Sequence, residues 1–307
     1  MQGNMQGQRI TTSPTRASCV GHTPVFSLPE LSSYFGIKHL WVKDESANPL
    51  GTHKDRKSLA VVRKAMRLAG SSRPQAFCIL TAGNAGLSLA RFASSSAIPV
   101  IAFISEDNIS PILKTELESA CERVVRLDLN GHEWSSQELC DIAGATLGLR
   151  VLDVTNGVID PYSAIVSEIC LLNPERQPDV IVMPVGCGEL FLGVERGLKR
   201  HGLKARLVGV TTQERSIADK LYARWRPQGN HVTELTLNGS PHHLLNLCDE
   251  SLLLDTYNWL RLTNLIKCEP SSAAAFTALF KIKSQLRPDE KVMVINTGTF
   301  SAKLTYP

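Results

Sequence analysis

Short apolar runs alternate with longer, partly polar segments along most of this chain. The short runs are rich in Val, Ile and Leu, whereas the longer segments repeat apolar residues with a helical period, and Gly, Asn and Ser lie in the turns between them. This alternation is typical of βαβ units and predicts an α/β fold with a mostly parallel sheet. Strands are predicted at 39–42, 77–80, 100–104, 123–127, 151–154, 179–185, 206–210 and 291–296.

Helices are predicted between these strands. The segment 55–70 is expected to end at Gly70 and to bury one apolar face, formed by Leu59, Val62, Met66 and Ala69. We expect a flexible arm over the first 29 residues and a surface loop over 227–243, which is rich in Asn, Gly, Pro and His. The other helices are predicted at 84–93, from 111, at 134–147 and 161–172, after 188, and at 215–225 and 271–285.

The bulk properties narrow the class of protein. A chain of 307 residues with 43% hydrophobic content is long enough for two lobes. Its formal charge of +4 is small and its Lys and Arg residues are scattered, so we expect a small-molecule partner and neither a nucleic-acid-binding nor a membrane surface. The 8 cysteines form no CxxC pair and indicate reduced thiols of a cytoplasmic protein. No apolar stretch approaches the roughly 20 residues of a membrane span.

Four loops follow predicted strands, where open α/β sheets collect ligands. The first, GTHKDRKS (51–58), places Lys54 at the start of a helix. A cation is unfavourable there because the helix dipole prefers anions. One interpretation is therefore that Lys54 has a chemical role, such as forming a Schiff base, and does not stabilise the helix. The alternative is that Lys43, Lys54, Arg56 and Lys57 only solvate the edge of a helix.

The second loop, TAGNAG (81–86), opens a helix directly after a strand. Its small residues allow a ligand to approach the main chain, and the N–H groups of a helix start bind carboxylates. Asn84 is a candidate to direct its amide at a ligand, or it is only the N-cap of the helix.

The third loop, GCGEL (186–190), has the glycine-rich character of an anion-binding turn before a helix. A dinucleotide site is disfavoured, because the spacing is GxGxxxxG and the next strand does not end in an acid. A plain tight turn is the other interpretation. The fourth loop, NTGT (296–299), offers the Thr297 hydroxyl to a heteroaromatic nitrogen, or to backbone groups of its own turn.

Together these motifs resemble one enzyme family. KDESANPLGTHKDR, TAGNAG, PVGCGEL and VINTGT, with EPSSAAAF at 269–276, are similar to the motifs of fold-type II pyridoxal-phosphate enzymes. That group includes threonine synthase, cysteine synthase, threonine dehydratase and tryptophan synthase β. The resemblance spans roughly 22–304 and is greatest to threonine synthases, whose NPTGSFKDR is similar to NPLGTHKDR here.

The resemblance implies a role for each motif. Lys54 would form the internal aldimine, a Schiff base with pyridoxal phosphate, and Asn84 would bond the cofactor's 3′-oxygen. Thr297 would face the pyridine nitrogen. The substrate carboxylate would be held by Thr81, Ala82, Gly83, Asn84 and Ala85. The cofactor phosphate would be held by backbone donors of Gly186, Cys187, Gly188, Glu189 and Leu190.

The family fold implies two lobes, each a mostly parallel sheet flanked by helices. We expect a smaller inserted domain at 41–155 and a larger domain from 1–40 and 156–307, which would hold the cofactor's phosphate and ring nitrogen. A homodimer is usual in the family. Neither Cys187 as a nucleophile nor a metal at His242–His243 is expected, because neither position has further catalytic or ligand residues near it in sequence.

The residue types suit one class of reaction. A freed Lys54 amine would remove the substrate's Cα proton, and a neutral hydroxyl at Thr297 would leave the ring a mild electron sink. We therefore expect elimination or replacement at the β or γ carbon of an amino acid, by a threonine synthase-like lyase or synthase. A cysteine synthase-like β-replacement enzyme or a serine/threonine dehydratase is the alternative, and outside this class a nucleotide-binding protein or a non-catalytic sensor.

One segment departs from the threonine synthase pattern. TNGVIDPYSAIVSEI (155–169) carries no cation, whereas threonine synthases usually have an arginine here that helps to bind phosphohomoserine. Glu189 also stands where glycine is common, and Ala82 where serine is common. The leaving group of the substrate is therefore left open by the sequence.

Overall fold

The computed structural model describes residues 9–10, 19–105, 111–129, 132–212, 216–221 and 242–299. The chain divides into two compact units, which are described separately. The first unit comprises Met1–His53 and Tyr162–Phe300, and the second comprises Lys54–Pro161. The boundaries expected for the smaller inserted domain, at residues 41 and 155, stay a prediction.

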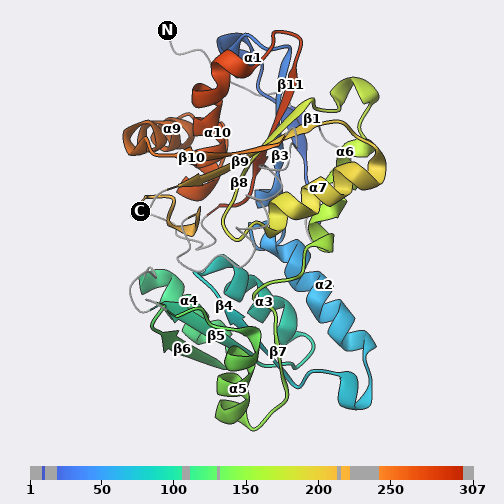
Figure 1. Ribbon diagram of the computed structural model, residues 1–307, viewed down its shortest axis with the longest axis vertical. Coiled ribbons are helices and arrows are strands. Elements are labelled where there is room, and N and C mark those ends of the chain that lie inside the picture. Colours follow the sequence, from blue (N-terminus) through green and yellow to red (C-terminus); the bar gives the residue numbers. More distant parts are fainter. Residues whose placement is uncertain are drawn as a thin grey trace. The chain divides into compact units, whose positions relative to one another are not determined.

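The first unit is built on a sheet in the order β1-β2-β3-β11-β8-β9-β10 (Figure 1). Its strands from β3 to β10 run parallel, and β1 and β2 add an antiparallel edge. The central strands are buried apolar runs, as expected where helices cover both faces of a sheet. The strands are β1 (Arg9–Ile10), β2 (Val25–Ser27), β3 (His39–Asp44), β8 (Val180–Pro184), β9 (Arg206–Thr212), β10 (His243–Leu247) and β11 (Lys291–Asn296).

Helices pack on both sides of this sheet. Figure 1 shows α9 (Glu250–Leu262) and α10 (Pro270–Ile282) on one side, and α6 (Ser163–Cys170) and α7 (Glu189–His201) on the other. The short helix α1 (Pro29–Phe35) precedes β3. Small side chains bring α10 close to the strands, because its alanines at 273, 274, 275 and 278 are fully buried in the core of this unit.

The second unit holds a four-stranded parallel sheet in the order β6-β5-β4-β7. Helices α2 and α3 pack together beside β4, and their shared core includes Val61, Phe77 and Leu89. The strands are β4 (Ala76–Leu80), β5 (Val100–Ser105), β6 (Arg123–Leu127) and β7 (Val151–Asp153), and the helices are α2 (Lys54–Arg67), α3 (Asn84–Ser94), α4 (Pro111–Ala120) and α5 (Ser136–Leu147).

The predicted parallel α/β pattern is confirmed, whereas several local expectations differ from the structure. The flexible arm is wrong at its described positions: β2 pairs with β3, Thr23 is buried, and β1 pairs with β2. These strands of two and three residues are too short to show an alternating pattern. Of the expected loop 227–243, residues 227–241 lie outside the described residues, and His243 begins β10. The helix α9 was not expected, although Leu253, Thr256 and Leu260 form its buried face.

The buried face of α2 also differs from the prediction. Met66 is 46% exposed, and the helix ends at Arg67 before Gly70. The buried apolar residues are Val61, Val62 and Ala65. The prediction followed the apolar residues alone, whereas the first turn of α2 buries charged side chains and so rotates the covered face.

Candidate functional site

Three loops meet at one edge of the first unit's sheet. The strands β3, β11 and β8 are parallel neighbours, with Asn296 paired to Asp44 and Val294 to Val182. Their carboxyl ends therefore lie side by side, and each end leads into a loop that the sequence singled out. The Asn296 side chain donates to Asp44 Oδ1 at 2.8 Å, and burial raises the pKa of that carboxyl despite this bond.

The glycine turn, defined as Gly186–Leu190, follows β8 and starts α7 at Glu189. Gly188 precedes the helix with a φ of 89°, in the left-handed region that glycine adopts without strain. A Cβ at Gly186 would lie 2.7 Å from the Lys220 carbonyl oxygen, so only glycine fits this close approach. The first N–H groups of α7 have no partner within the helix, and a compact anion suits such a set of donors.

Cys187 and Glu189 interact within this turn. The Cys187 thiol donates to Glu189 Oε2 at 3.8 Å, and the Glu189 side chain is fully buried at the positive end of α7. A carboxylate in this place complements the helix dipole.

Two hydroxyl groups lie together after β11. Thr297 Oγ1 and Ser272 Oγ of α10 are 2.6 Å apart, and both residues are buried. Ser272 Oγ also donates to the Gly298 carbonyl and accepts from the Gly298 N–H, each at 3.1 Å. Ser272 therefore bonds both backbone groups of Gly298 in the turn after β11. The Thr297 hydroxyl lies against the Ser272 hydroxyl. The sequence analysis did not assign Ser272, although EPSSAAAF contains it.

The segment before Lys54 is anchored to the same turn. The Thr297 carbonyl oxygen accepts from the His53 main-chain N–H at 2.9 Å and contacts His53 Nδ1 at 2.9 Å. Because a carbonyl only accepts, Nδ1 carries the proton. Thr52 forms a β-bridge to Gly298. Lys54, the first residue of α2, thus directly follows His53, which is bonded to the turn at Thr297 and Gly298. We call this turn the hydroxyl turn.

Lys43 is part of the interior and does not solvate a helix edge. Its Nζ donates to Glu168 Oε2 at 2.5 Å and to the Thr23 carbonyl at 2.7 Å, and the residue is 1% exposed. The Thr23 hydroxyl in turn donates to Glu45 Oε1 at 2.7 Å. This network fixes the end of β3 and the start of the loop that leads to Lys54.

An ion pair connects the glycine turn with the start of α10. Lys220 Nζ bonds Glu269 Oε2, while the Lys220 main chain faces Gly186 and the Glu269 N–H donates to the Gly298 carbonyl at 3.0 Å. Burial raises the pKa of the neighbouring Asp219 carboxyl, and Lys220 opposes that rise. We call Lys220 and Glu269 the clasp, because they join the glycine turn to the hydroxyl turn.

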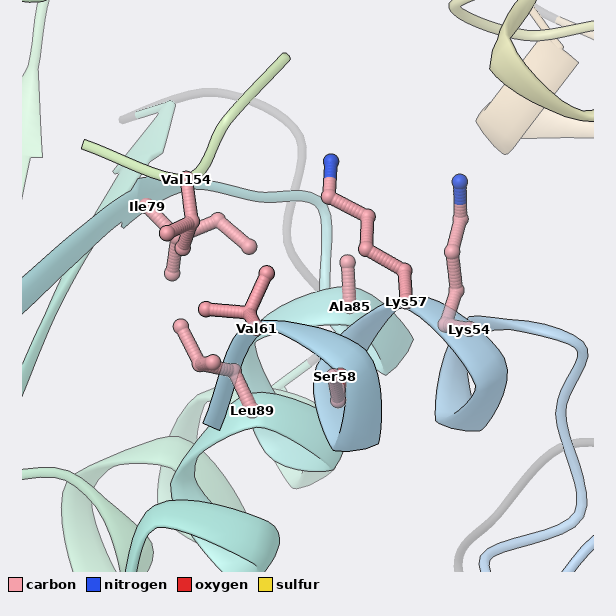
Figure 2. A pocket seen from close by; sticks show the side chains of 8 residues that line it. All are labelled: Lys54, Lys57, Ser58, Val61, Ile79, Ala85, Leu89 and Val154. Carbon is pink, nitrogen blue, oxygen red and sulfur yellow. The ribbon is translucent and has the colours of Figure 1, made fainter. Parts of the chain in front are cut away.

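In the second unit, Lys54 and Lys57 line one small pocket at the start of α2 (Figure 2). Lys54 is half-buried, whereas Lys57 is 5% exposed and donates to the Thr155 carbonyl at 2.9 Å. Asp55 is fully buried and accepts from Ser88 Oγ at 2.7 Å. The solvated-edge interpretation is therefore wrong for the residues that follow Lys54.

The loop Thr81–Ala85 opens α3 beside this pocket, and Ala85 lines it. Thr81 Oγ1 accepts from the N–H groups of Gly83 and Gly86 at 3.0 and 3.1 Å, which fixes the turn. The N-cap of α3 is Gly83, so the N-cap interpretation of Asn84 is wrong. Asn84 is instead the first helical residue, with a buried side chain.

The predicted site residues thus fall into two sets. Gly186–Leu190 and Thr297 lie at neighbouring strand ends of the first unit, and Lys54, Thr81, Asn84 and Ala85 lie in the second unit, with Ala82 and Gly83 in the same loop. That both sets surround one cofactor stays a prediction, as does the role of each residue.

The histidine pair His242–His243 lies at the start of β10. His242 Nδ1 accepts from the Leu207 N–H at 3.0 Å, and partial burial lowers the pKa of His242. His243 is the first residue of β10. Within the described ranges, no group of three or more His, Cys, Asp or Glu side chains is arranged to hold a metal ion.

Comparisons with known proteins show which family, relatives and solved structures this chain is similar to. A family model described as "Pyridoxal-phosphate dependent enzyme" matches residues 17–298. Threonine synthase of Methanocaldococcus jannaschii is 22% identical over 91% of this chain and 75% of its own length. Cysteine synthase B of Pseudomonas aeruginosa is 28% identical over 66% of this chain and 68% of its own length. Among solved structures, a pyridoxal 5′-phosphate-dependent aspartate racemase superposes with a TM-score of 0.76 at 17% identity, covering 91% of this chain and 90% of the racemase.

Proposed function

Because the chain belongs to the family of pyridoxal-phosphate dependent enzymes, we propose that it eliminates or replaces a group at the β or γ carbon of an amino acid, as a threonine synthase-like lyase or synthase. The expected family, the two-lobed fold type and the pyridoxal phosphate cofactor are confirmed. The specific reaction is the part proposed here.

The residues of the first unit suit the cofactor's two ends. The glycine turn offers main-chain donors at the start of α7, which suits a phosphate. One hydroxyl of the Thr297–Ser272 pair, after turning its proton away from its present acceptor, would donate to the pyridine nitrogen. Both lie at neighbouring strand ends, so one planar molecule with a phosphate tail would span them.

The second unit supplies the groups that act on the substrate. When bound, pyridoxal phosphate supplies an aldehyde for amines and a ring that accepts electrons from the substrate's α-carbon. Lys54 Nζ would hold the cofactor covalently, and after release would accept the Cα proton. The start of α3 at Asn84 and Ala85 would orient the substrate carboxylate through main-chain N–H groups.

The hydroxyl pair of Ser272 and Thr297 is the observation that carries the choice of reaction. A hydroxyl is neutral and does not hold a proton on a ring nitrogen as a carboxylate does. A ring without that proton withdraws fewer electrons, which favours loss of a leaving group over transamination. The match to cysteine synthase B makes β-replacement the second candidate, and a serine/threonine dehydratase would use the same residues.

A panel of amino acids tests this proposal. The purified protein, loaded with pyridoxal phosphate, is titrated with O-phosphohomoserine, O-phosphoserine, O-acetylserine, serine and threonine while its visible spectrum and the keto-acid or amino-acid products are followed. We expect a spectral change and elimination or replacement with at least one of them. Transamination products with all of them would refute the proposed reaction. A loaded protein that changes with none of them would indicate the non-catalytic sensor.

The clasp provides a separate prediction. Lys220→Met removes the ion pair that connects the glycine turn to α10, so the turn should hold the phosphate less firmly. One charge-assisted hydrogen bond contributes about 1.5–3 kcal/mol, so we expect pyridoxal phosphate to bind roughly tenfold more weakly. Fluorescence titration of the apoprotein measures this affinity.

A matched variant controls for the loss of a lysine. Lys281→Met removes an exposed ion pair to Asp249, at 2.7 Å, in the same unit. It should change cofactor affinity by less than about twofold, since exposed pairs contribute about 0–1 kcal/mol and this one is remote from the glycine turn in sequence. Equal affinities for the two variants would contradict the role of the clasp.

The assembly and location also belong to the proposal. None of the helices in the described ranges is long and apolar enough to cross a bilayer. A homodimer and a cytoplasmic location stay predictions from the family resemblance, and light scattering of the purified protein tests the first of them.

A further inference from the structure

Ser272 and Thr297 form a set of hydrogen bonds in which each proton can be assigned. Ser272 is fully buried and Thr297 is 4% exposed. Each hydroxyl has a single proton to donate and two lone pairs that accept. Their oxygen atoms are 2.6 Å apart, so one of the two protons lies between them.

The proton between the two oxygen atoms belongs to Thr297. Ser272 Oγ donates its own proton to the Gly298 carbonyl at 3.1 Å, so it has none left for Thr297. Ser272 Oγ therefore accepts the Thr297 proton together with that of the Gly298 N–H, which donates at 3.1 Å. Both hydroxyl protons have an acceptor in this resting arrangement, and the lone pairs of Thr297 Oγ1 receive no donor from the residues that the structure describes.

A second arrangement of the same bonds requires only that the hydroxyl protons turn. The Gly298 carbonyl also accepts from the Glu269 N–H at 3.0 Å, so it stays bonded when Ser272 turns its proton away. Ser272 can then donate to Thr297 across 2.6 Å, which is a better distance for an O–H···O bond than 3.1 Å. This change releases the Thr297 proton for a new acceptor. Thr297 thus offers lone pairs in the resting arrangement and a proton in the second one.

We propose that Ser272 is a positioning residue that lets Thr297 act as either donor or acceptor toward the ring nitrogen of pyridoxal phosphate. This inference rests on the proposed function, in which the hydroxyl pair meets that nitrogen. When the nitrogen carries no proton, Ser272 donates to Thr297 and Thr297 donates to the ring. When the nitrogen carries a proton, Thr297 accepts it as a hydrogen bond and donates its own proton to Ser272. Neither case leaves a buried hydroxyl proton unpaired, which would be unfavourable.

Removal of the Ser272 hydroxyl should make Thr297 depend on the ring nitrogen. In Ser272→Ala, the Thr297 proton has lost its acceptor within the pair, and a ring nitrogen without a proton can take that place. A ring that lacks this acceptor should bind poorly to the variant, because it leaves a buried donor unpaired. The Gly298 N–H also loses its acceptor in Ser272→Ala, which weakens the hydroxyl turn for every ring alike. The ratio of two affinities therefore separates a role in directing protons from a purely structural one.

Two cofactors that differ in one ring atom provide the test. Dissociation constants of the apoprotein are measured by fluorescence for pyridoxal phosphate and for its 1-deaza analogue, in which a C–H group replaces the ring nitrogen. The wild type should prefer pyridoxal phosphate by about tenfold or less, because the analogue leaves the resting arrangement intact. In Ser272→Ala this preference should rise about tenfold further, as for one buried donor left without an acceptor. In Thr297→Val, which removes the donor, the preference should disappear.

Further variants keep the comparison interpretable. Thr277→Val removes another buried hydroxyl of α10, which donates to the Ala273 carbonyl at 3.0 Å, and should leave the preference within about twofold of the wild type. Thr297→Ser keeps the hydroxyl and should retain the wild-type preference. If Ser272→Ala does not fold, Ser272→Cys carries the same comparison, because a thiol accepts only weakly and should raise the preference in the same direction.

The outcomes separate this inference from the proposed function. If Ser272→Ala weakens both cofactors equally and the preference is unchanged, Ser272 only holds the hydroxyl turn, and the inference is overturned while the choice of reaction stands. A preference that is the same in the wild type and in Thr297→Val would show that the hydroxyl pair does not meet the ring nitrogen, and would overturn both. The amino-acid panel tests the reaction separately, because its readout does not involve the analogue.

Discussion

Lys54→Ala is expected to abolish covalent attachment of pyridoxal phosphate and to lower the turnover number by about 10³-fold or more. The variant lacks the amine that condenses with the cofactor's aldehyde and afterwards accepts the substrate's Cα proton. The protein should still fold, because Lys54 is half-buried at the start of α2, and alanine favours a helix. The measurements are the visible spectrum after dialysis and the rate with the best substrate of the panel.

The control for this variant lies on the same helix. Lys64→Ala removes an exposed lysine from the last turn of α2 and should leave both the spectrum and the rate within about twofold of the wild type. A Lys54→Ala protein that still carries a covalently bound pyridoxyl group after borohydride reduction and dialysis would mean that another amine holds the cofactor.

Gly186→Ala is expected to weaken pyridoxal phosphate binding by roughly 10- to 100-fold, the loss of one charge-assisted hydrogen bond at about 1.5–3 kcal/mol. The added Cβ would lie 2.7 Å from the Lys220 carbonyl oxygen, a main-chain atom that cannot rotate away. Either the glycine turn or the segment at Lys220 must shift, and the N–H donors of the turn shift with it. Titration of the apoprotein with pyridoxal phosphate, followed by fluorescence, gives the affinity.

The other end of α7 offers a matched control. Gly202 follows the helix with a φ of 66°, and a Cβ there has no atom within 4 Å. Gly202→Ala should lower the free energy of unfolding by roughly 1 kcal/mol, because alanine is strained in the left-handed region, and should leave cofactor affinity unchanged. If the two variants lose affinity equally, the glycine turn does not hold the phosphate.

The positions of the candidate loops in the fold could be predicted from the sequence because each loop is local. The glycine turn, the TAGNAG loop and Lys54 each lie between a strand and a helix. The parallel strands β3, β11 and β8 bring their carboxyl ends to one edge of the first unit's sheet, whereas the TAGNAG loop follows β4 in the sheet of the second unit. The order of these motifs along the chain was sufficient to indicate the family, which the family model confirms over residues 17–298.

The partners of these residues could not be predicted, because they come from distant parts of the chain. Ser272 and Thr297 are 25 residues apart, and Lys57 and Thr155 are 98 apart. A sequence pattern shows which residues repeat along a helix or strand, but it does not show which side chains meet across elements. The clasp between Lys220 and Glu269 was missed for the same reason.

Burial of charge explains the error in α2. The prediction oriented the helix by its apolar residues alone and did not consider burial of Asp55, Arg56 and Lys57. All three are at most 5% exposed, because Asp55 is bonded by Ser88 and Lys57 by the Thr155 carbonyl. These charged residues are exceptions to the rule that charges face water, and Asp55 and Lys57 are buried with hydrogen-bond partners.

Identification of the modified lysine tests the central claim most directly. The loaded protein is reduced with borohydride, digested with chymotrypsin, which cleaves at neither lysine, arginine nor aspartate, and fragmented by mass spectrometry to locate the pyridoxyl group. Lys54 and Lys57 lie in the same peptide, so the fragment ions must separate them. The account predicts the pyridoxyl mass on Lys54 alone, whereas its presence on Lys57, on Lys220 or on no lysine would contradict it.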